Sequence, residues 1–519
     1  MEAIRIENLR SIKDSGYIPI KSLNILLGKN SSGKSTFLRT FPLLKQSVKK
    51  SLRGPLLWFD ANSVDFGDYD IAKNRYADST EYIKFGFKVS TQNRKRTLQR
   101  LRYRNQISYI TSSNISNEIS LEVSINKDAK GAFINEILVF MDNNTIGLSS
   151  KTRTDSLNIT INNELLNDNH PIKWNYSQTH GIIPTLVPGK SESNIFSFQS
   201  YILDSIIEKI KVFCDKRLKD ISKILNLLTY IREIDKTSLL IHLKEQAIIP
   251  SLAKNIQSWN KETPEFIEIY NLWLLIQIPF ILELVDDEIK LFFQNSSYIA
   301  PTRAEALRFY RNQELEVSEV DAYGRNLQEF ISSLPEKQLL DLQRFTKKAI
   351  GVNIFVSNSM SHQSINIEHT RGDSFNLADV GFGYSQILPI IIKLWHATTK
   401  KNNYNYSRPH QYNHDVSIVI EQPELHLHPA MQAVVADVFI QALKLAKINE
   451  INLHLIIETH SPTIVNRIGR RISESQLNTS ETQILIFDKD SNIQNTEISS
   501  VYFNEKGQIQ NWPLGFFEP

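Results

Sequence analysis

The sequence predicts an α/β fold in which the two ends of the chain together form a nucleotide-binding core. The first observation is a phosphate-binding pattern, G-x-x-x-x-G-K-[ST], which residues 28–35 match without a mismatch between a strand-like run and a helix-like run. The second is a β-branched run far downstream, 416–420, typical of a buried strand, with another strand-like run at 453–458. The third is the different patterning of residues 80–295, which predicts an insertion.

The inserted region has two parts. Runs such as 82–89 and 119–125 alternate apolar and polar residues, which predicts an antiparallel sheet. Farther on, runs such as 202–210 are helical in pattern. We therefore divide the chain into four segments: 1–79 and 296–519 as the two halves of the core, 80–195 as a β-rich insertion, and 196–295 as a helical insertion.

The composition is that of an ordinary globular protein, with 22% charged and 41% hydrophobic residues. The net charge is only +3, so contact with DNA or RNA would need a local patch. Cys214 is the single cysteine, which excludes an internal disulfide and a Cys-based zinc site and fits a reducing cytoplasm. The N-terminus lacks the apolar core of a signal peptide, and the apolar window 272–285 is short and interrupted. We therefore expect a buried helix there, no membrane contact and a cytoplasmic location.

The phosphate-binding pattern assigns specific roles. Such a loop turns successive backbone N–H groups toward an anion at a helix N-terminus. Gly28 and Gly33 carry no Cβ, so the backbone can wrap closely. Lys34 would reach the β- and γ-phosphates, and Ser35 would ligate Mg²⁺, so the predicted cofactors are ATP and Mg²⁺. The loop residues expected to bind the nucleotide are Gly28, Asn30, Ser31, Ser32, Gly33, Lys34, Ser35 and Thr36.

A carboxylate follows the buried run 416–420. Glu421 ends this run, and the C-terminal end of a buried strand beside a phosphate loop is where P-loop NTPases hold Mg²⁺. We therefore assign Glu421, with the loop serine, to the metal. His426 and His428 lie in the following turn, but their number and spacing do not suit zinc. A helix is expected to begin at Pro429.

The run 453–458 leads into Thr-His-Ser, residues 459–461. This order of phosphate loop, carboxylate strand and strand-Thr-His-Ser resembles ABC-type ATPases, and the resemblance implies that His460 is the switch residue at the γ-phosphate. Residues 377–386 resemble the glycine-rich signature turn of that superfamily, with glycine in place of the usual serine. The resemblance implies that this turn binds the γ-phosphate held by a second protomer, so that two heads sandwich two ATP molecules. The residues implied to act across the dimer are Gly381, Gly383 and Ser385.

Four short segments in the two predicted halves of the core point to a narrower group of ABC-type ATPases. They are 6–14, 64–69, 298–303 and 511–517. They resemble prokaryotic ABC-type ATPases of the OLD, RecF and SMC neighbourhood, and residues 80–290 are outside the resemblance. Arg10 lies in the segment 6–14, and on the basis of this resemblance we assign it to nucleotide binding. Several members are the ATPase halves of anti-phage systems such as Septu, Gabija, PARIS and retron-linked modules. The resemblance therefore implies an ATPase that controls a partner effector, a nuclease or a toxin.

Two departures from that family bear on activity. Gln422 stands at the second acidic position, and a glutamine amide takes up no proton at neutral pH. Glu424, or Gln422 through its amide, would then position the attacking water, or Glu421 would share this catalytic work. We expect slow hydrolysis. OLD-type nucleases end in a Toprim domain of acidic motifs, whereas only 59 residues follow His460 here. We therefore expect residues 484–490 to be a strand and turn, and no nuclease site.

Basic clusters leave nucleic-acid contact open, although most such clusters form a solvated face or structural ion pairs. They are Arg94, Lys95, Arg96, Arg100, Arg102 and Arg104; Arg467, Arg470 and Arg471; and Arg303 with Arg308. The apolar tail, 512–517, is expected to pack on the core. The expected partners are further copies of the chain in a homodimer or higher homo-oligomer, a separate effector, and DNA or a phage component. The alternatives are a RecF-like DNA-repair ATPase and a nucleotide-gated scaffold that barely hydrolyses ATP.

Overall fold

The computed structural model divides the chain into two compact units. We call residues 6–49, 57–81 and 291–519 the core unit, and residues 1–5, 50–56 and 82–290 the insert unit. The core unit thus joins segments from both ends of the chain. The residues that the structure describes are 1–91, 118–166, 172–176, 182–188, 195–215, 221–229, 235–311, 315–359, 361–369, 372–399, 414–489 and 495–511.

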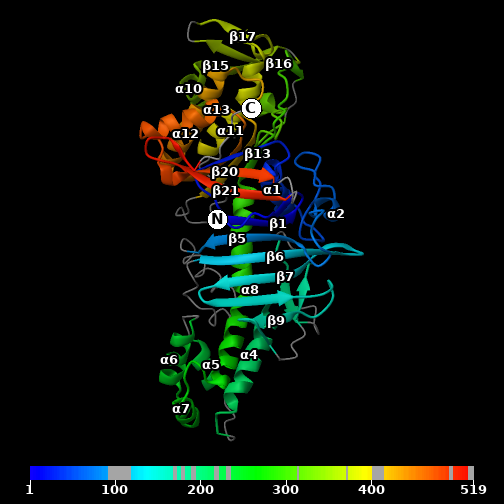
Figure 1. Cartoon of the computed structure of the whole chain (residues 1–519), viewed down its shortest axis with the longest axis vertical. Helices are drawn as coiled ribbons and strands as arrows, with labels where there is room; N and C mark the ends of the chain where they lie inside the picture. The colour runs from blue at the N-terminus through cyan, green and yellow to red at the C-terminus, as the bar shows by residue number, and fades with distance from the viewer. Residues whose placement is uncertain are drawn as a thin grey trace. The chain divides into compact units, whose positions relative to one another are not determined.

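The core unit is built on a sheet with the strand order β1-β2-β21-β20-β4-β19-β18-β13 (Figure 1). The bounds of its strands are β1 (Ala3–Leu9, which begins in the insert unit), β2 (Ile12–Asp14), β4 (Leu23–Gly28), β13 (Ser296–Ile299), β18 (His414–Glu421), β19 (Ile451–Glu458), β20 (Thr482–Lys489) and β21 (Thr496–Phe503). The short strands β3 (Ile18–Pro19) and β22 (Ile509–Gln510) complete this part. The five strands from β20 to β13 are parallel, so their carboxyl ends meet at one edge.

Both faces of this parallel sheet are buried, which is why its strands are almost continuously apolar. Alternate side chains such as Ile25, Ile420 and Ile457 belong to one hydrophobic cluster with helices α11, α12 and α13. The side chains between them, such as Leu26 and Val419, are equally buried, and α1 contacts the same strands. The helices of the unit are α1 (Lys34–Val48), α2 (Tyr69–Ala72), α9 (Leu327–Ser332), α10 (Glu336–Ile350), α11 (Phe382–Thr399), α12 (Pro429–Ile448) and α13 (Pro462–Ser473), with 3-10 turns η3 (Leu377–Asp379) and η4 (Thr479–Glu481).

A second, antiparallel sheet of the core unit contains β14 (Tyr310–Arg311), β15 (Val352–Ser359), β16 (His362–His369) and β17 (Ser374–Asn376). It leads through η3 into α11 and lies at the top of Figure 1. The strands and helices predicted around the phosphate loop, at Glu421, before His460 and from Pro429 are confirmed, as is the strand over 484–489.

The insert unit contains the predicted antiparallel sheet, with the order β10-β9-β8-β7-β6-β5. Its strands are β5 (Ile83–Ser90), β6 (Glu118–Asp128), β7 (Gly131–Met141), β8 (Asn144–Ser149), β9 (Asn158–Ile161) and β10 (Glu164–Leu165), with a separate pair, β11 (Ile172–Asn175) and β12 (Thr185–Pro188). Its helices are α4 (Ile195–Lys211), α5 (Ser222–Thr229), α6 (Lys236–Gln246), α7 (Pro250–Ile256) and α8 (Pro264–Gln294, which ends in the core unit). Sheet and helices form one compact unit here.

Helix α8 is the one described helix that is long and apolar enough to cross a membrane by length and composition. Its most apolar window is 78% buried inside the protein, as in a core helix. The side chain of Asp286 on α8 accepts hydrogen bonds from the backbone N–H groups of Ile182 and Ile183, and the Tyr270 hydroxyl accepts one from Asn144. These contacts tie α8 to the strand region of its own unit.

Candidate nucleotide-binding site

The phosphate-binding loop leaves the carboxyl end of β4 and enters α1, as predicted. Three of its residues have a positive φ: Gly28 at 154°, Ser31 at 63° and Gly33 at 99°. A Cβ on Gly33 would also lie only 2.7 Å from the Thr496 hydroxyl, so any larger residue would be strained and crowded there. Positive φ values in a loop that enters a helix are typical of anion-binding loops, whose backbone N–H groups face the ligand.

A cavity of about 430 Å³ lies at this loop. Its lining residues are Ser11, Asn30, Ser31, Ser32, Gly33, Lys34, Ser35, Thr36, Gln422 and Glu458. The Ser32 hydroxyl is buried and has no hydrogen-bond partner among the described residues, so a donor is available for an incoming oxygen. The cavity is lined by donors, one ammonium and one carboxylate, and this set fits a nucleotide phosphate with a divalent cation.

Lys34 is buried beside this cavity. Its Nζ donates to the carbonyl oxygens of Gly28, at 2.8 Å, and Lys29, at 2.7 Å, and lies 3.9 Å from Glu458 Oε1. Burial lowers the pKa of Lys34, and the neighbouring Glu458 and Glu424 partly offset this effect. The ammonium is therefore held at the loop by weak neutral acceptors, where a phosphate oxygen is a stronger partner.

Ser35 meets a carboxylate that the sequence analysis did not single out. Its hydroxyl donates to Glu458 Oε2 at 2.9 Å, and Glu458 lines the cavity. Burial, followed by the negative charge of Glu421, raises the pKa of Glu458 to about 7. The negative charge of such a buried carboxylate is only partly balanced by its surroundings, so a nearby cation stabilises its ionised form. The available signal was its place as the last residue of the strand before Thr-His-Ser.

The structure places Glu421 differently from its predicted magnesium role. Its carboxylate accepts two hydrogen bonds from Arg39, at 2.7 and 2.9 Å, and one from the Tyr298 hydroxyl at 2.8 Å. The Ser35 hydroxyl bonds to Glu458 instead, and Glu421 does not line the cavity. The hydrogen bonds and charge of Glu421 raise the pKa of Arg39 against the opposing effect of burial. Glu421 here anchors α1 to the end of β18.

Gln422 and Glu424 are also distinguished by geometry. Gln422 has a positive φ of 42° and lines the cavity. Glu424 does not line it, because its two oxygens accept from the Thr459 hydroxyl at 2.8 Å and from the backbone N–H of His460 at 2.6 Å. Burial raises the pKa of Glu424. The structure therefore brings Gln422 to the phosphate loop and uses Glu424 to hold the Thr-His turn.

His460 lies close enough to the phosphate loop for the charge of Lys34 to affect its pKa. Burial, and then the positive charge of Lys34, lower the pKa of His460. The imidazole is therefore neutral at pH 7 and carries one N–H that can donate to a phosphate oxygen. The side chain does not line the cavity itself.

Arg303 connects the turn after β18 to helix α11. It is 5% exposed, its Nη2 donates to the Gln422 carbonyl at 3.2 Å, and its Nε contacts Gln386 Oε1 on α11 at 3.4 Å. Burial lowers the pKa of Arg303 to about 10, and the charge of Glu424 opposes this. This residue, considered above for a phosphate or interface role, is thus a structural link inside the core unit.

The turn that resembles the ABC signature, within residues 377–386, leads into a helix as expected, but not all of its predicted site residues face outward. Gly381 is exposed with φ 92°, immediately before α11. Gly383 follows in the first turn of the helix. Ser385 is buried, and its hydroxyl donates to the Phe382 carbonyl at 2.7 Å, so it does not face outward. Arg10 also turns away from the cavity: its guanidinium lies 4.3 Å over the Phe66 ring.

The remaining sequence features have structural partners or fall outside the described residues. His428 caps α12, and no group of three or more His, Cys, Asp or Glu among the described residues could hold a metal ion. Arg467 and Arg471 form ion pairs with Asp437, Arg470 pairs with Glu474, and Arg308 pairs with Asp379. The basic cluster from Arg94 to Arg104, residue 490 and the tail 512–517 lie outside the described part of the chain.

The comparisons with known proteins give the family. Residues 1–465 match the AAA_15 family, described as an AAA ATPase domain. The chain belongs to this family. A search of curated proteins finds no match. As a member of an ATPase family with an intact phosphate loop, the protein is an ATP-binding ATPase with the predicted α/β fold.

Solved structures similar to the chain include SMC head domains. One is an Smc head domain with an extended coiled coil, bound to the C-terminal domain of ScpA, from Pyrococcus furiosus; it has 12% identity and a TM-score of 0.35, covering 96% of each chain. Another is an SMC head domain from Thermotoga maritima, with 7% identity and a TM-score of 0.33, covering 96% of this chain and 97% of the other.

Proposed function

We propose that this protein is an ABC-type ATPase that binds ATP and Mg²⁺ between two head-to-head copies and hydrolyses ATP slowly. The observation that carries the proposal is the phosphate-loop cavity, which combines Lys34, the Ser35–Glu458 pair and Gln422. Its position at the carboxyl edge of a parallel sheet, beside the turn of His460, supports the same assignment.

Slow turnover follows from the side chain at position 422. A general base must accept a proton from the attacking water, and a carboxamide does not do so at neutral pH. Glu424 is a poor substitute, because its oxygens already accept from Thr459 and His460. Gln422 can still orient a water through its amide oxygen, so hydrolysis is slowed rather than abolished.

The metal would be held by Ser35 and Glu458. Hydroxyl and carboxylate oxygens are the ligands that Mg²⁺ prefers, and the phosphates and water complete its coordination. When bound, Mg²⁺ neutralises the β- and γ-phosphate oxygens. Lys34 adds a fixed positive charge to the same oxygens, and His460 donates from its neutral ring.

We propose further that ATP-dependent pairing of two heads controls a separate effector, a nuclease or toxin, in anti-phage defence. This part rests on the resemblance of the terminal segments to defence ATPases. Gln422 also favours a second function, a nucleotide-gated scaffold that binds ATP and barely hydrolyses it. A RecF- or SMC-like DNA-repair ATPase is the third, and it predicts stimulation of turnover by duplex DNA.

The test is phosphate release by the full-length protein, alone and with duplex DNA, beside the Lys34→Ala and Gln422→Glu variants. We expect slow release that Lys34→Ala abolishes and that Gln422→Glu raises at least about tenfold, because a carboxylate restores the base. ATP binding is measured in parallel with a fluorescent ATP analogue.

Two outcomes favour the alternative functions, and a third concerns the site itself. ATP binding without release in the parent protein, together with release by Gln422→Glu, supports the scaffold. Release that duplex DNA raises several-fold supports the repair function. Nucleotide binding that survives Lys34→Ala unchanged would overturn the assignment of the cavity.

A further inference from the structure

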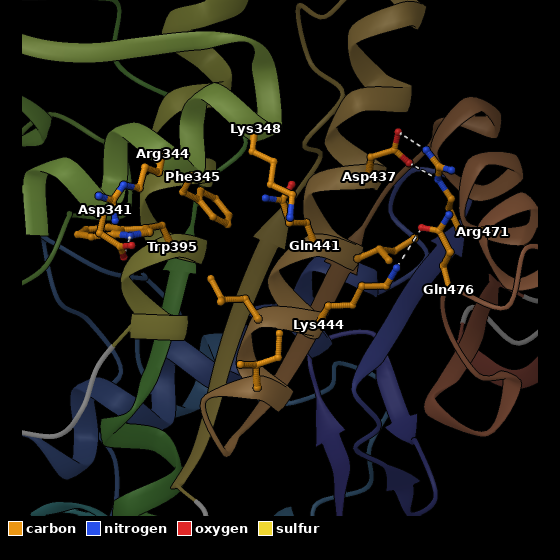
Figure 2. Close-up of a pocket in the computed structure, with 13 residues that line it drawn as sticks. Asp341, Arg344, Phe345, Lys348, Trp395, Asp437, Gln441, Lys444, Arg471 and Gln476 are labelled. Carbon is orange, nitrogen blue, oxygen red and sulfur yellow. Dashed lines mark hydrogen bonds and ion pairs between the residues drawn. The ribbon is translucent and has the colours of Figure 1, made fainter.

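A groove of about 400 Å³ lies in the core unit, away from the phosphate loop. Helices α10 and α12 form its sides, α11 contributes to its floor, and α13 with the following turn closes one end (Figure 2). No residue of the phosphate-loop cavity lines it. Its lining residues are Asp341, Arg344, Phe345, Lys348, Trp395, Asp437, Ile440, Gln441, Lys444, Leu445, Ile448, Arg471 and Gln476.

The floor of the groove is apolar and held in place. Phe345, Trp395 and Ile440 are buried, and the Trp395 indole N–H donates to Asp341 Oδ2 at 3.0 Å, which fixes the orientation of the ring. At the rim, Ile448 at the end of α12 is 77% exposed. An exposed isoleucine beside an aromatic floor forms an apolar surface on which a side chain of another molecule can pack.

The walls of the groove carry unneutralised positive charge. Arg344 and Lys348 are one helical turn apart on α10, so both point along the same side of that helix. Neither makes a hydrogen bond or ion pair within the described part of the chain. Across the groove, Lys444 on α12 donates only to the neutral Gln476 side chain, at 3.1 Å. Figure 2 shows these cations on both sides of the floor.

The acidic residues of the groove are already engaged. Asp437 accepts hydrogen bonds from Arg467 and Arg471, which lower its pKa against the opposing effect of burial. Asp341 is bound to the Trp395 indole. Arg344, Lys348 and Lys444 have no acidic partner among the described residues, so the cations of the groove outnumber its two aspartates, and carboxylates are their natural partners.

We infer that this groove docks an acidic amphipathic helix of a partner protein. One apolar side chain of the helix would rest on Phe345 and against Ile448. Carboxylates one turn apart on the helix would pair with Arg344 and Lys348, in the helix-in-groove mode of recognition. A nucleic-acid backbone fits less well, because the floor of the groove is apolar and a phosphate backbone offers no apolar group to fill it.

The inference does not depend on ATP turnover and assigns a surface that the catalytic proposal leaves unused. The probe is a fluorescein-labelled helical peptide with leucines on one face and glutamates one turn apart, measured by fluorescence anisotropy against the full-length protein. The matched peptide carries lysine at every glutamate, and a single-stranded oligonucleotide serves as the competing chemistry.

The decisive variant is the double replacement Arg344→Glu with Lys348→Glu. Its matched control is Lys337→Glu with Lys347→Glu, which makes the same charge change at exposed positions of the same helix outside the groove. A third variant, Ile448→Ser, removes the apolar rim without changing charge. Circular dichroism and ATP turnover report on folding, since none of these residues lies at the phosphate loop.

The expected result is binding of the acidic peptide that weakens at least tenfold in the double variant and several-fold in Ile448→Ser, while the control double variant binds within about threefold of the parent protein. Binding that is equal for the acidic and basic peptides, or equal in the double variant and its control, overturns the inference. Oligonucleotide binding that displaces the acidic peptide and is lost in the same variant also overturns it, in favour of nucleic acid.

Discussion

At the residue scale, two glutamates with the same position on neighbouring strands have different partners. Glu421 ends β18 and Glu458 ends β19, and the two are paired in register. Of these two strands, β19 lies directly beside β4, the strand that leads into the phosphate loop, and β18 does not. Glu458 therefore meets Ser35, whereas Glu421, one strand farther away, meets Arg39.

This difference gives a prediction for magnesium dependence. Replacing Glu458 with glutamine removes the charge beside Ser35, and we expect the Mg²⁺ concentration for half-maximal turnover to rise about tenfold or more. Turnover is measured across a magnesium titration in both variants, Glu458→Gln and Glu421→Gln.

The matched variant has a different expected defect. Glu421→Gln leaves the Arg39 guanidinium without its bidentate partner, so we expect a lower melting temperature with little change in magnesium dependence. If Glu421→Gln shifts the magnesium titration and Glu458→Gln does not, the original assignment of Glu421 to the metal is right.

At the element scale, two lysines and their partners join four segments of the core unit. The Nζ of Lys393 on α11 donates to the Tyr298 carbonyl in β13 at 2.7 Å, and Lys45 on α1 forms an ion pair with Glu319 at 2.7 Å. Burial lowers the pKa of Lys393 to about 8, and Glu319 partly compensates. For Glu319, burial alone would raise the pKa, but Lys45 and Lys393 outweigh it and lower the pKa well below 4.5.

The signs of these shifts predict how Glu319→Gln changes stability with pH. The stabilisation from Glu319 is present above about pH 4.5, because its folded-state pKa is depressed, and part of it comes from protonated Lys393. Above pH 8 folded Lys393 is neutral, so that part is lost. The Glu319 side chain is 31% exposed, so solvent screens the pair. We expect Glu319→Gln to reduce the free energy of unfolding by about 1 kcal/mol at pH 7 and by less at pH 9.

Urea denaturation of the parent protein and Glu319→Gln at the two pH values checks this. A loss that is equal at pH 7 and pH 9 would show that Lys393 does not contribute to the effect of Glu319. A matched surface variant, Glu336→Gln at the exposed start of α10, controls for the general loss of a negative charge.

At the scale of the whole molecule, the signature turn sets an expectation for self-association. Gly381 and the start of α11 are accessible in the single chain, and a helix N-terminus favours an anion. A Cβ on Gly383 would meet only Leu427, at an ordinary 3.7 Å, so a side chain there is tolerated within the protomer.

Gly383→Glu should therefore leave the fold intact and repel a phosphate presented by a second copy. We expect the parent protein to form dimers with ATP and Mg²⁺, and Gly383→Glu to weaken this association at least tenfold, as measured by mass photometry. Ser374→Glu, on exposed β17, is the control and should dimerise like the parent protein. Equal dimerisation of all three proteins would contradict the role of the signature turn.

Several features could be predicted from the sequence because they depend on local chemistry. The glycines and lysine of the phosphate loop need no distant partner to be recognised, and apolar continuity identified the buried strands β4, β18 and β19. The alternating pattern of the insertion likewise predicted its antiparallel strands. The sequence by itself thus determined the fold class, the phosphate loop and the joining of both chain ends.

Only the tertiary structure decided which of the distant side chains meet. Strand order brings Glu458 to Ser35, and the turn after β18 brings Gln422 to the cavity while Glu424 binds Thr459 and His460. The groove between α10 and α12 likewise joins residues about a hundred positions apart. The physical reason is that the chemistry of each side chain is given by its own residue type. Which distant side chains come into contact depends on how the strands and helices are ordered in space.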